Sequence, residues 1–363
     1  MKNSIKITAI VIGALAIVLI IFYEQFSGNK FSYERTEQLT QLEIAPNLVT
    51  SEFKSQHSSV SLNQNFSLEY AAQPPVDSTN TAKMDYDSDW CIAAKDLNQE
   101  DIAYFEQELN DWNISRGRIS TPLQFGDEYV HLYNSSQLTA PYMEVSYDAI
   151  WQQIQVGNIF AMIAALGRDD FDRDNKRKIA VRLVVQGHTS KPLKYLITVE
   201  LVKAKMLYED TNLITPDIEE HLYRALAYTA YGIKYVDLDA AFTYLRIINS
   251  SEFPLKLNPI HALGKNNRID EYTLALENYI YKMRTEENIT LAFPMDEPPK
   301  AARHYFDSRL ASLYREFGVA LNGLKVILPE TTGAMLEASE CVQKQVQFIN
   351  DLERGRKARQ RVH

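Results

Sequence analysis

Two consecutive amphipathic segments, each divided by a glycine, constrain the fold of this chain more than any other feature. In the first, apolar residues recur at i, i+3, i+4 and i+7 through Tyr147–Gly157, and the stripe resumes in Asn158–Gly167. In the second, Ile179, Ala180, Leu183 and Val184 line one face of Lys176–Gly187, and an apolar side continues in Ser190–Tyr208. Glycine adopts the left-handed backbone that ends a helix without a Cβ clash. The pattern therefore predicts two successive helical hairpins.

The turns between these helices resemble those of Sel1-like repeats, which are related to TPR repeats. In Ile154–Met162 two apolar residues precede Gly-Asn, and Ala-Met follows, while Val184–Ser190 is similar to a second such turn. The two glycines are 30 residues apart, which is shorter than the usual repeat, and two valines replace the usual alanines before the second turn. The resemblance implies stacked helical hairpins that bind proteins, without a catalytic constellation.

Further helices are expected on both sides of these hairpins. Their expected ranges are Asn98–Leu109, Thr215–Gly232, Asp237–Ile248, Ile269–Met283, Ala301–Phe317 (closed by Gly318) and Thr332–Leu352. We expect residues 118–143 to form a loop, or a loop with a short hairpin, because Gly126 and Pro141 break any regular helical pattern there. We expect an all-α body of stacked antiparallel helical hairpins, either a TPR/Sel1-like α-solenoid or a compact helical array.

The N-terminus predicts one transmembrane helix. Lys2 and Lys6 precede the uncharged residues 7–23, and Glu24 is the next charge. About 17 residues is the lower limit for a spanning helix, and Lys6 can extend the run by snorkelling. A cleaved signal peptide is the alternative, although no small-x-small cleavage site follows the run. The anchor hypothesis places the N-terminus in the cytoplasm and the body in the periplasm of a bacterium, attached to the inner membrane.

Composition divides the rest of the chain. The expected parts are residues 1–24 (cytoplasmic N-terminus and anchor), 25–85 (flexible tether), 86–146 (N-terminal helix and irregular cap), 147–353 (helical body) and 354–363 (basic tail). Cys91 and Cys341 are the only cysteines; they either pair in an oxidising compartment or stay as two buried thiols.

Charge and motifs argue against several functions. A net charge of −9 excludes a typical nucleic-acid surface. Asp170–Asn175 looks like the start of a calcium loop, but Val181 stands at the twelfth position, where a calcium loop needs an acid. We therefore interpret the acids as a turn that favours the next helix N-terminus. The cations of the tail, Arg354–Arg361, either suit a helix end or contact anionic lipid or an acidic partner.

No catalytic, cofactor-binding or metal-ligating residues are predicted. The histidines His57, His131, His188, His221, His261, His304 and His363 form no pair at metal-ligand spacing. The working hypothesis is a scaffold or adaptor for a protein or peptide partner in the cell envelope. The alternative is an envelope hydrolase with a non-local active site, which a pocket holding His131, His221 or His304 beside acids would favour.

Overall fold

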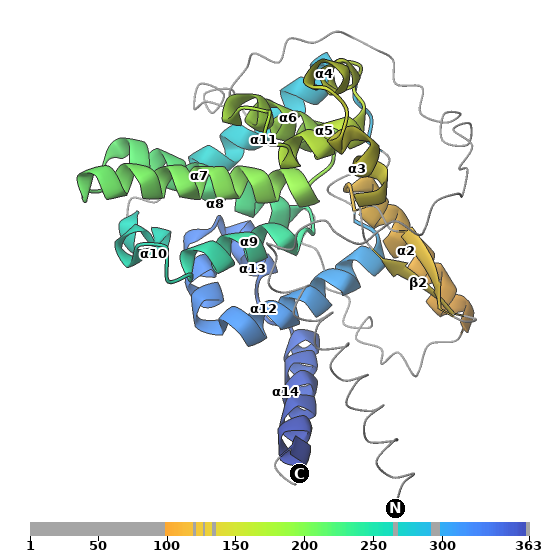
Figure 1. Cartoon of the computed structure of the whole chain (residues 1–363). Helices are drawn as coiled ribbons and strands as arrows, with labels where there is room; N and C mark the ends of the chain where they lie inside the picture. Colours follow the sequence, from red (N-terminus) through yellow and green to blue (C-terminus); the bar gives the residue numbers. More distant parts are fainter. Residues whose placement is uncertain are drawn as a thin grey trace, which may run out of the picture. The chain divides into compact units, whose positions relative to one another are not determined.

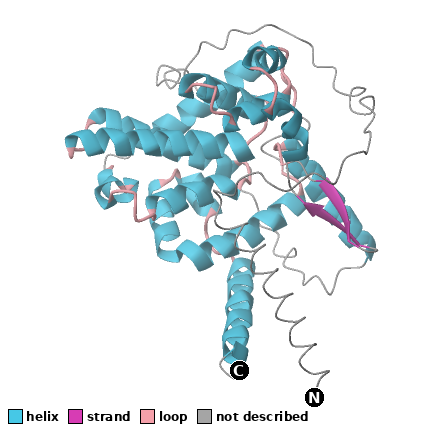
Figure 2. Ribbon diagram, in the orientation of Figure 1, coloured by secondary structure: helices cyan, strands magenta, loops and turns pink. Residues whose placement is uncertain are grey.

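The computed structural model describes residues 99–118, 121–125, 128–132, 136–263, 268–291 and 298–360, all within one compact unit, Gln56–His363. Helices dominate the described residues, and one antiparallel β-hairpin accompanies them (Figures 1 and 2). The first elements are α2 (Gln99–Ser115), β1 (Thr121–Phe125), β2 (Glu128–Leu132), α3 (Ser136–Met143), α4 (Tyr147–Gln155), α5 (Ile159–Gly167), α6 (Arg173–Val185) and α7 (Ser190–Thr211). The others are α8 (Pro216–Lys234), α9 (Leu238–Ile248), η4 (Leu255–Leu257), α10 (Pro259–Ala262), α11 (Ile269–Glu286), α12 (Lys300–Ile327), α13 (Glu330–Met335) and α14 (Glu340–Gln360).

Five helices, α2, α4, α6, α8 and α11, end in the same hydrogen-bonded turn. In each, an amide beyond the helix end donates to a carbonyl five residues earlier, and the residue just before that amide has a positive φ, as in a Schellman motif. The bonds are Arg118 to Asn113 (2.8 Å), Asn158 to Gln153 (3.0 Å), His188 to Leu183 (2.9 Å), Asp237 to Gly232 (2.8 Å) and Ile289 to Arg284 (2.9 Å). The positive φ angles are 76° at Gly117, 82° at Gly157, 91° at Gly187, 59° at Val236 and 52° at Asn288. The two expected glycine turns are confirmed, and three more occur.

The second helices of the pairs α4/α5, α6/α7 and α8/α9 contact one another in order. Helix α5 packs on α7, α7 on α9, and α9 on α12, so four helices form a row, while α8 packs against α7, α9 and α11. The approach between α8 and α9 is close, since a Cβ on Gly232 would lie 2.4 Å from Cβ of Ala240. Small residues at both positions therefore let the two helices pack tightly.

Two apolar clusters form the interior. The larger includes Trp112 of α2, runs from α6 to α14, and contains the fully buried Tyr228, Tyr231 and Tyr244. The smaller joins α4, α5 and α6 around Ile150, and Leu166 packs against both clusters. The apolar residues that recur with helical periodicity in the sequence are therefore the ones buried in these clusters.

The acidic turn expected before α6 is confirmed as a helix cap. The Asp172 carboxylate accepts a hydrogen bond from the amide of Asn175 at 2.7 Å, so the helix begins at Arg173 and not at Lys176. Ser190 is the first residue of α7 and does not cap it. Thr189 precedes α7, and its hydroxyl donates to the Asp237 carboxylate at 2.6 Å and does not cap the helix.

Three other predictions need correction. Residues 118–143 contain the optional hairpin, with Phe125 opposite Glu128, but also the helix α3, which packs on α5. Gly318 does not end α12, because the buried stripe continues beyond it through Leu321 and Leu324. The expected last helix is two helices, since Ser339 starts α14 with its hydroxyl accepting from the amide of Val342 at 3.3 Å.

Several predictions lie outside the described residues. They concern the anchor at residues 7–23, the tether at 25–85, the expected helix start at Asn98, and Cys91. Within the described ranges, no helix has both the length and the apolarity to cross a membrane.

Candidate binding surface and the polar clusters behind it

A buried carboxylate joins α6, α7 and α8. One carboxylate oxygen of Glu200, in α7, forms an ion pair with Arg177 at 2.9 Å, and the other lies 2.6 Å from Nδ1 of His221. The Glu200 side chain is 1 % exposed, whereas those of Arg177 and His221 are 20 % and 18 % exposed. A buried carboxylate needs such partners to offset its desolvation. The cluster therefore holds three helices at a fixed relative position.

The hydrolase alternative needs a histidine beside an acid, and His221 beside Glu200 meets that requirement. A glutamate that holds Nδ1 orients an imidazole and leaves Nε2 available for proton transfer. His304 instead stacks edge-on against Phe105, with ring centroids 5.5 Å apart, and the side chain of His131 lies outside the described residues. Among the described residues, no group of His, Cys, Asp and Glu has the arrangement of a metal site.

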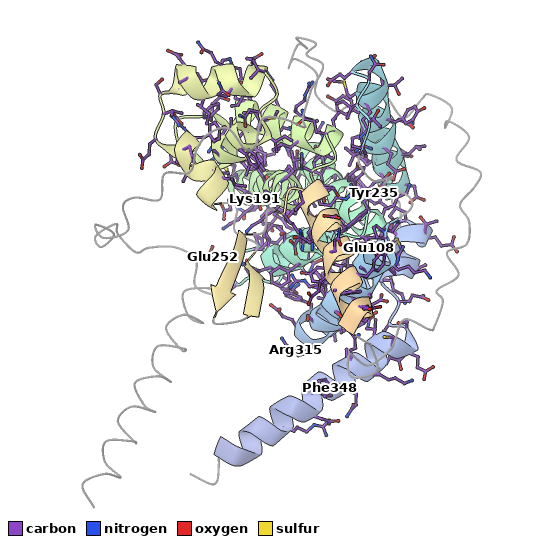
Figure 3. The ribbon with its side chains drawn as sticks, turned by 90° about the vertical axis from the view of Figure 1, so that its right-hand side faces the viewer. Glu108, Lys191, Tyr235, Glu252, Arg315 and Phe348 are labelled. Atoms are coloured by element: carbon purple, nitrogen blue, oxygen red, sulfur yellow. The ribbon has the colours of Figure 1, made fainter. Side chains whose placement is uncertain are left out.

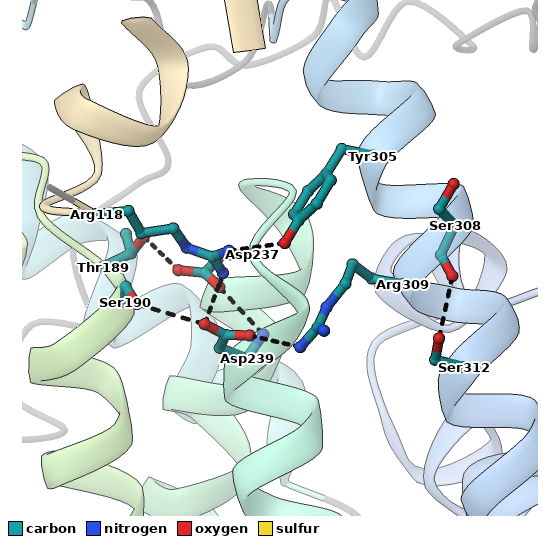
Figure 4. A network of polar contacts seen from close by, with 9 residues as sticks. All are labelled: Arg118, Thr189, Ser190, Asp237, Asp239, Tyr305, Ser308, Arg309 and Ser312. Atoms are coloured by element: carbon teal, nitrogen blue, oxygen red, sulfur yellow. Dashed lines mark hydrogen bonds and ion pairs between the residues drawn. The ribbon is translucent and has the colours of Figure 1, made fainter. Parts of the chain in front are cut away.

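A second cluster fixes the end of α2 to α9 and α12 (Figure 4). Nη2 of Arg118 lies 3.0 Å from Asp237 and 2.7 Å from Asp239, at the start of α9. Asp239 also pairs with Arg309 of α12 at 3.2 Å, and Tyr305 lies 3.5 Å from Nη1 of Arg118. Burial by itself lowers the pKa of Arg118, but the two carboxylates outweigh it and raise that pKa. The network connects α2, α9 and α12.

A third cluster covers the C-terminal end of α6 at the Gly187 turn. Arg284 of α11 donates to the carbonyls of Val185 (2.7 Å) and Val184 (3.1 Å). Arg116 reaches the Gly187 carbonyl at 3.4 Å and stacks on Trp112, with its guanidinium carbon 4.0 Å from the ring centroid. Burial lowers the pKa of Arg116 to about 10. Cations at a helix C-terminus are favourable, so α2 and α11 stabilise this turn.

His188, in the same turn, does not cap a helix with its side chain. Its ring packs over Gly117, where an added Cβ would lie 3.1 Å from Nδ1. Burial, followed by the neighbouring charge of Arg116, lowers the pKa of His188 to about 4. The imidazole is therefore neutral at pH 7, and it serves packing.

One surface differs in charge from the rest of the protein. Residues 173–211, which hold α6 and α7, carry nine basic and four acidic side chains, a net charge of +5. Since the whole chain has a net charge of −9, the remainder carries −14. Figure 1 shows α7 running across the body with α5 and α6 on one side and α9 on the other, as their contacts require. The part of α7 that its neighbours leave uncovered begins with the exposed cations Lys191 and Lys194 and ends with the exposed acids Glu209 and Asp210, so this surface is basic at its start.

We call this surface the α7 face. Its residues are Arg173, Lys191, Lys194, Tyr195, Val202 and Met206. Four of these side chains are exposed, and their positions along α7 differ by roughly whole helical turns, so they lie on one side of the helix. They are Lys191, Lys194, Val202 (39 % exposed) and Met206 (42 % exposed). Nη1 of Arg173 lies 3.9 Å from Sδ of Met206, and the Tyr195 hydroxyl donates to the Arg173 carbonyl at 3.4 Å, which joins α6 to the face.

The remaining sequence candidates are less suggestive. Nη1 of Arg168 donates to the carbonyls of Tyr142 and Val145, both at 2.7 Å, and Arg168 also pairs with Asp170, so that acid serves the loop. Arg354 of the basic tail is exposed and lies 3.4 Å from Asp351. A surface cavity of about 580 Å³ lies along the loop Ile248–Asn258, and none of its lining residues is charged except Glu252.

Sequence reasoning did not identify the α7 face. The signal was present in the spacing of Lys191, Lys194, Val202 and Met206 and in the local excess of cations. Comparison with family models finds no match, and no solved structure matches the chain significantly.

Proposed function

We propose that this protein is a non-catalytic scaffold or adaptor that binds a protein or peptide partner through a stack of helical hairpins. The observation that carries the proposal is the recurrence of one helix-ending turn on five helices, together with the row α5, α7, α9 and α12. Stacked hairpins offer extended surfaces made of side chains, which suits recognition of polypeptides. The Sel1-like resemblance of the first two turns supports the same function.

The proposal includes an extracytoplasmic location on a single N-terminal anchor at residues 7–23, in the inner membrane of a bacterium. Cys341 is disulfide-bonded, which supports this location because structural disulfides persist in oxidising compartments. Fusing a reporter that is active only in the periplasm to the C-terminus tests the topology. Reporter activity is expected, and activity of a cytoplasm-specific reporter at the same position would contradict it.

Affinity purification tests the binding function. The full-length protein, tagged and extracted in mild detergent after chemical cross-linking in cells, should retain one defined partner in stoichiometric amount. A Gly232→Ala variant, whose Cβ would collide with Ala240, is the matched variant with a disturbed stack. We expect it to lose the partner at temperatures where wild type retains it. Repeated absence of a reproducible partner would contradict the proposal.

The hydrolase alternative has one supporting observation, the contact between His221 and the buried Glu200. It predicts hydrolysis of an ester or peptide substrate that disappears in His221→Ala and is retained in His304→Ala. Hydrolytic activity that follows this pattern would replace the scaffold proposal. Equal inactivity of all three proteins across ester and peptide substrates would remove the alternative.

A further inference from the structure

We infer that the α7 face is the docking surface for an acidic polypeptide segment that carries apolar side chains. This inference rests on the proposed binding function and specifies the chemistry of the partner.

Unpaired cations make the face attractive to an anionic partner. Within the described part of the chain, Arg173, Lys191 and Lys194 have no ion-pair partner, although neighbouring Arg177 and Arg182 are paired with Glu200 and Glu287. Burial and, to a smaller extent, the charge of Lys194 lower the pKa of Lys191. An incoming carboxylate would favour the charged form of Lys191.

The position of the lysines in their helix adds to the argument. Lys191 lies in the first turn of α7 and Lys194 just beyond it, and that first turn contains no acidic residue. The helix macrodipole disfavours cations at this end. Figure 3 labels Lys191 near the start of α7. Asp237 and Asp239, which accept from the Thr189 and Ser190 hydroxyls, offset part of this cost, and a bound anion would offset more of it.

The apolar part of the face favours a polypeptide over a simple anion. Val202 and Met206 are exposed, and Met206 lies beside the side chain of Arg173. Methionine adapts to differently shaped partners and is common at binding surfaces. A strip that is cationic at the start of α7 and apolar further along fits a segment with acids at one end and an apolar anchor at the other.

Fluorescence anisotropy with the full-length protein in detergent tests the inference. The probe is a labelled, Glu-rich amphipathic peptide of about 20 residues with Leu at helical spacing. Wild type should bind it, more weakly as the salt concentration rises from about 0.05 M to about 0.5 M. The double variant Lys191→Glu/Lys194→Glu should bind roughly tenfold more weakly. Arg246→Glu/Lys256→Glu, which makes the same charge change at two exposed positions elsewhere, is the control and should bind within twofold of wild type.

Three kinds of outcome would overturn the inference. No binding by wild type up to about 1 mM, or equal losses in both double variants, would show that the face does not recognise acidic peptides. Binding to phosphatidylglycerol vesicles that depends on Lys191 and Lys194, without peptide binding, would assign the face to lipid. If the cross-linked partner of the full-length protein is retained by Lys191→Glu/Lys194→Glu, the scaffold proposal stands and this inference fails. If no partner is found at all, the scaffold proposal fails by itself.

Discussion

Replacing Gly232 with alanine probes the packing on which the hairpin stack depends. The new Cβ would lie 2.4 Å from Cβ of Ala240 and 3.2 Å from the Asp237 carbonyl, whereas carbon atoms normally meet at about 3.5–4 Å. Helices α8 and α9 would have to separate by about 1 Å, and such overpacking costs about 1–3 kcal/mol. The higher helix propensity of alanine offsets about 1 kcal/mol of this cost. We expect a net destabilisation on the order of 1 kcal/mol.

Gly318→Ala is the matched control for this experiment. Gly318 lies inside α12, and an added Cβ there would meet no atom within 4 Å. The control should therefore gain about 0.5–1 kcal/mol from helix propensity alone. Urea denaturation of both full-length variants in detergent, followed by circular dichroism, should separate them by about 2 kcal/mol. Equal stabilisation by the two substitutions would refute the close packing of α8 and α9.

Three further predictions concern charge, turn geometry and the disulfide. Burial, partly opposed by Arg303, raises the pKa of Asp307 to about 6. The contribution of Asp307 to stability is therefore full below about pH 4 and is lost as the pH rises through 6. Asp307→Asn should make thermal stability vary less between pH 4 and 7 and should add about 1 kcal/mol at pH 7, allowing for partial exposure. Gly157→Ala, at a φ of 82° in open space, should cost about 1 kcal/mol in urea denaturation, and an unchanged midpoint would contradict the turn. Mass spectrometry of unreduced digests should find the peptide of Cys341 linked to that of Cys91, and a link between two Cys341 peptides would contradict this.

The sequence predicted the helices where an apolar stripe and a chemical stop signal coincide. Thr215 and Pro216 begin α8 as expected, with the Thr215 hydroxyl accepting from the amide of Ile218 at 3.4 Å. The turn at Val236 was missed because a β-branched residue rarely has a positive φ, and tertiary packing imposes it there. Gly318 misled the prediction because glycine is tolerated within a helix whose buried stripe continues.

The candidate site was less predictable than the fold. Glu200 and His221 are 21 residues apart and meet only because α7 and α8 are antiparallel neighbours. Arg118 and Asp237 are 119 residues apart, and nothing local in the sequence indicates their ion pair. The α7 face was different, because all its residues except Arg173 lie on α7 and their spacing was readable before the structure. What the sequence did not show was which side of that helix the body leaves uncovered.

Site-specific photo-cross-linking tests the central claim most directly. A photoreactive amino acid at Val202, on the α7 face, is compared in living cells with one at Val319, which is 91 % exposed on α12. We predict that Val202 gives an adduct with one protein, that the cross-linked segment is acidic, and that the adduct disappears in Lys191→Glu/Lys194→Glu. Adducts that are equal from both positions, or an adduct from Val202 that survives the charge reversal, would contradict the account.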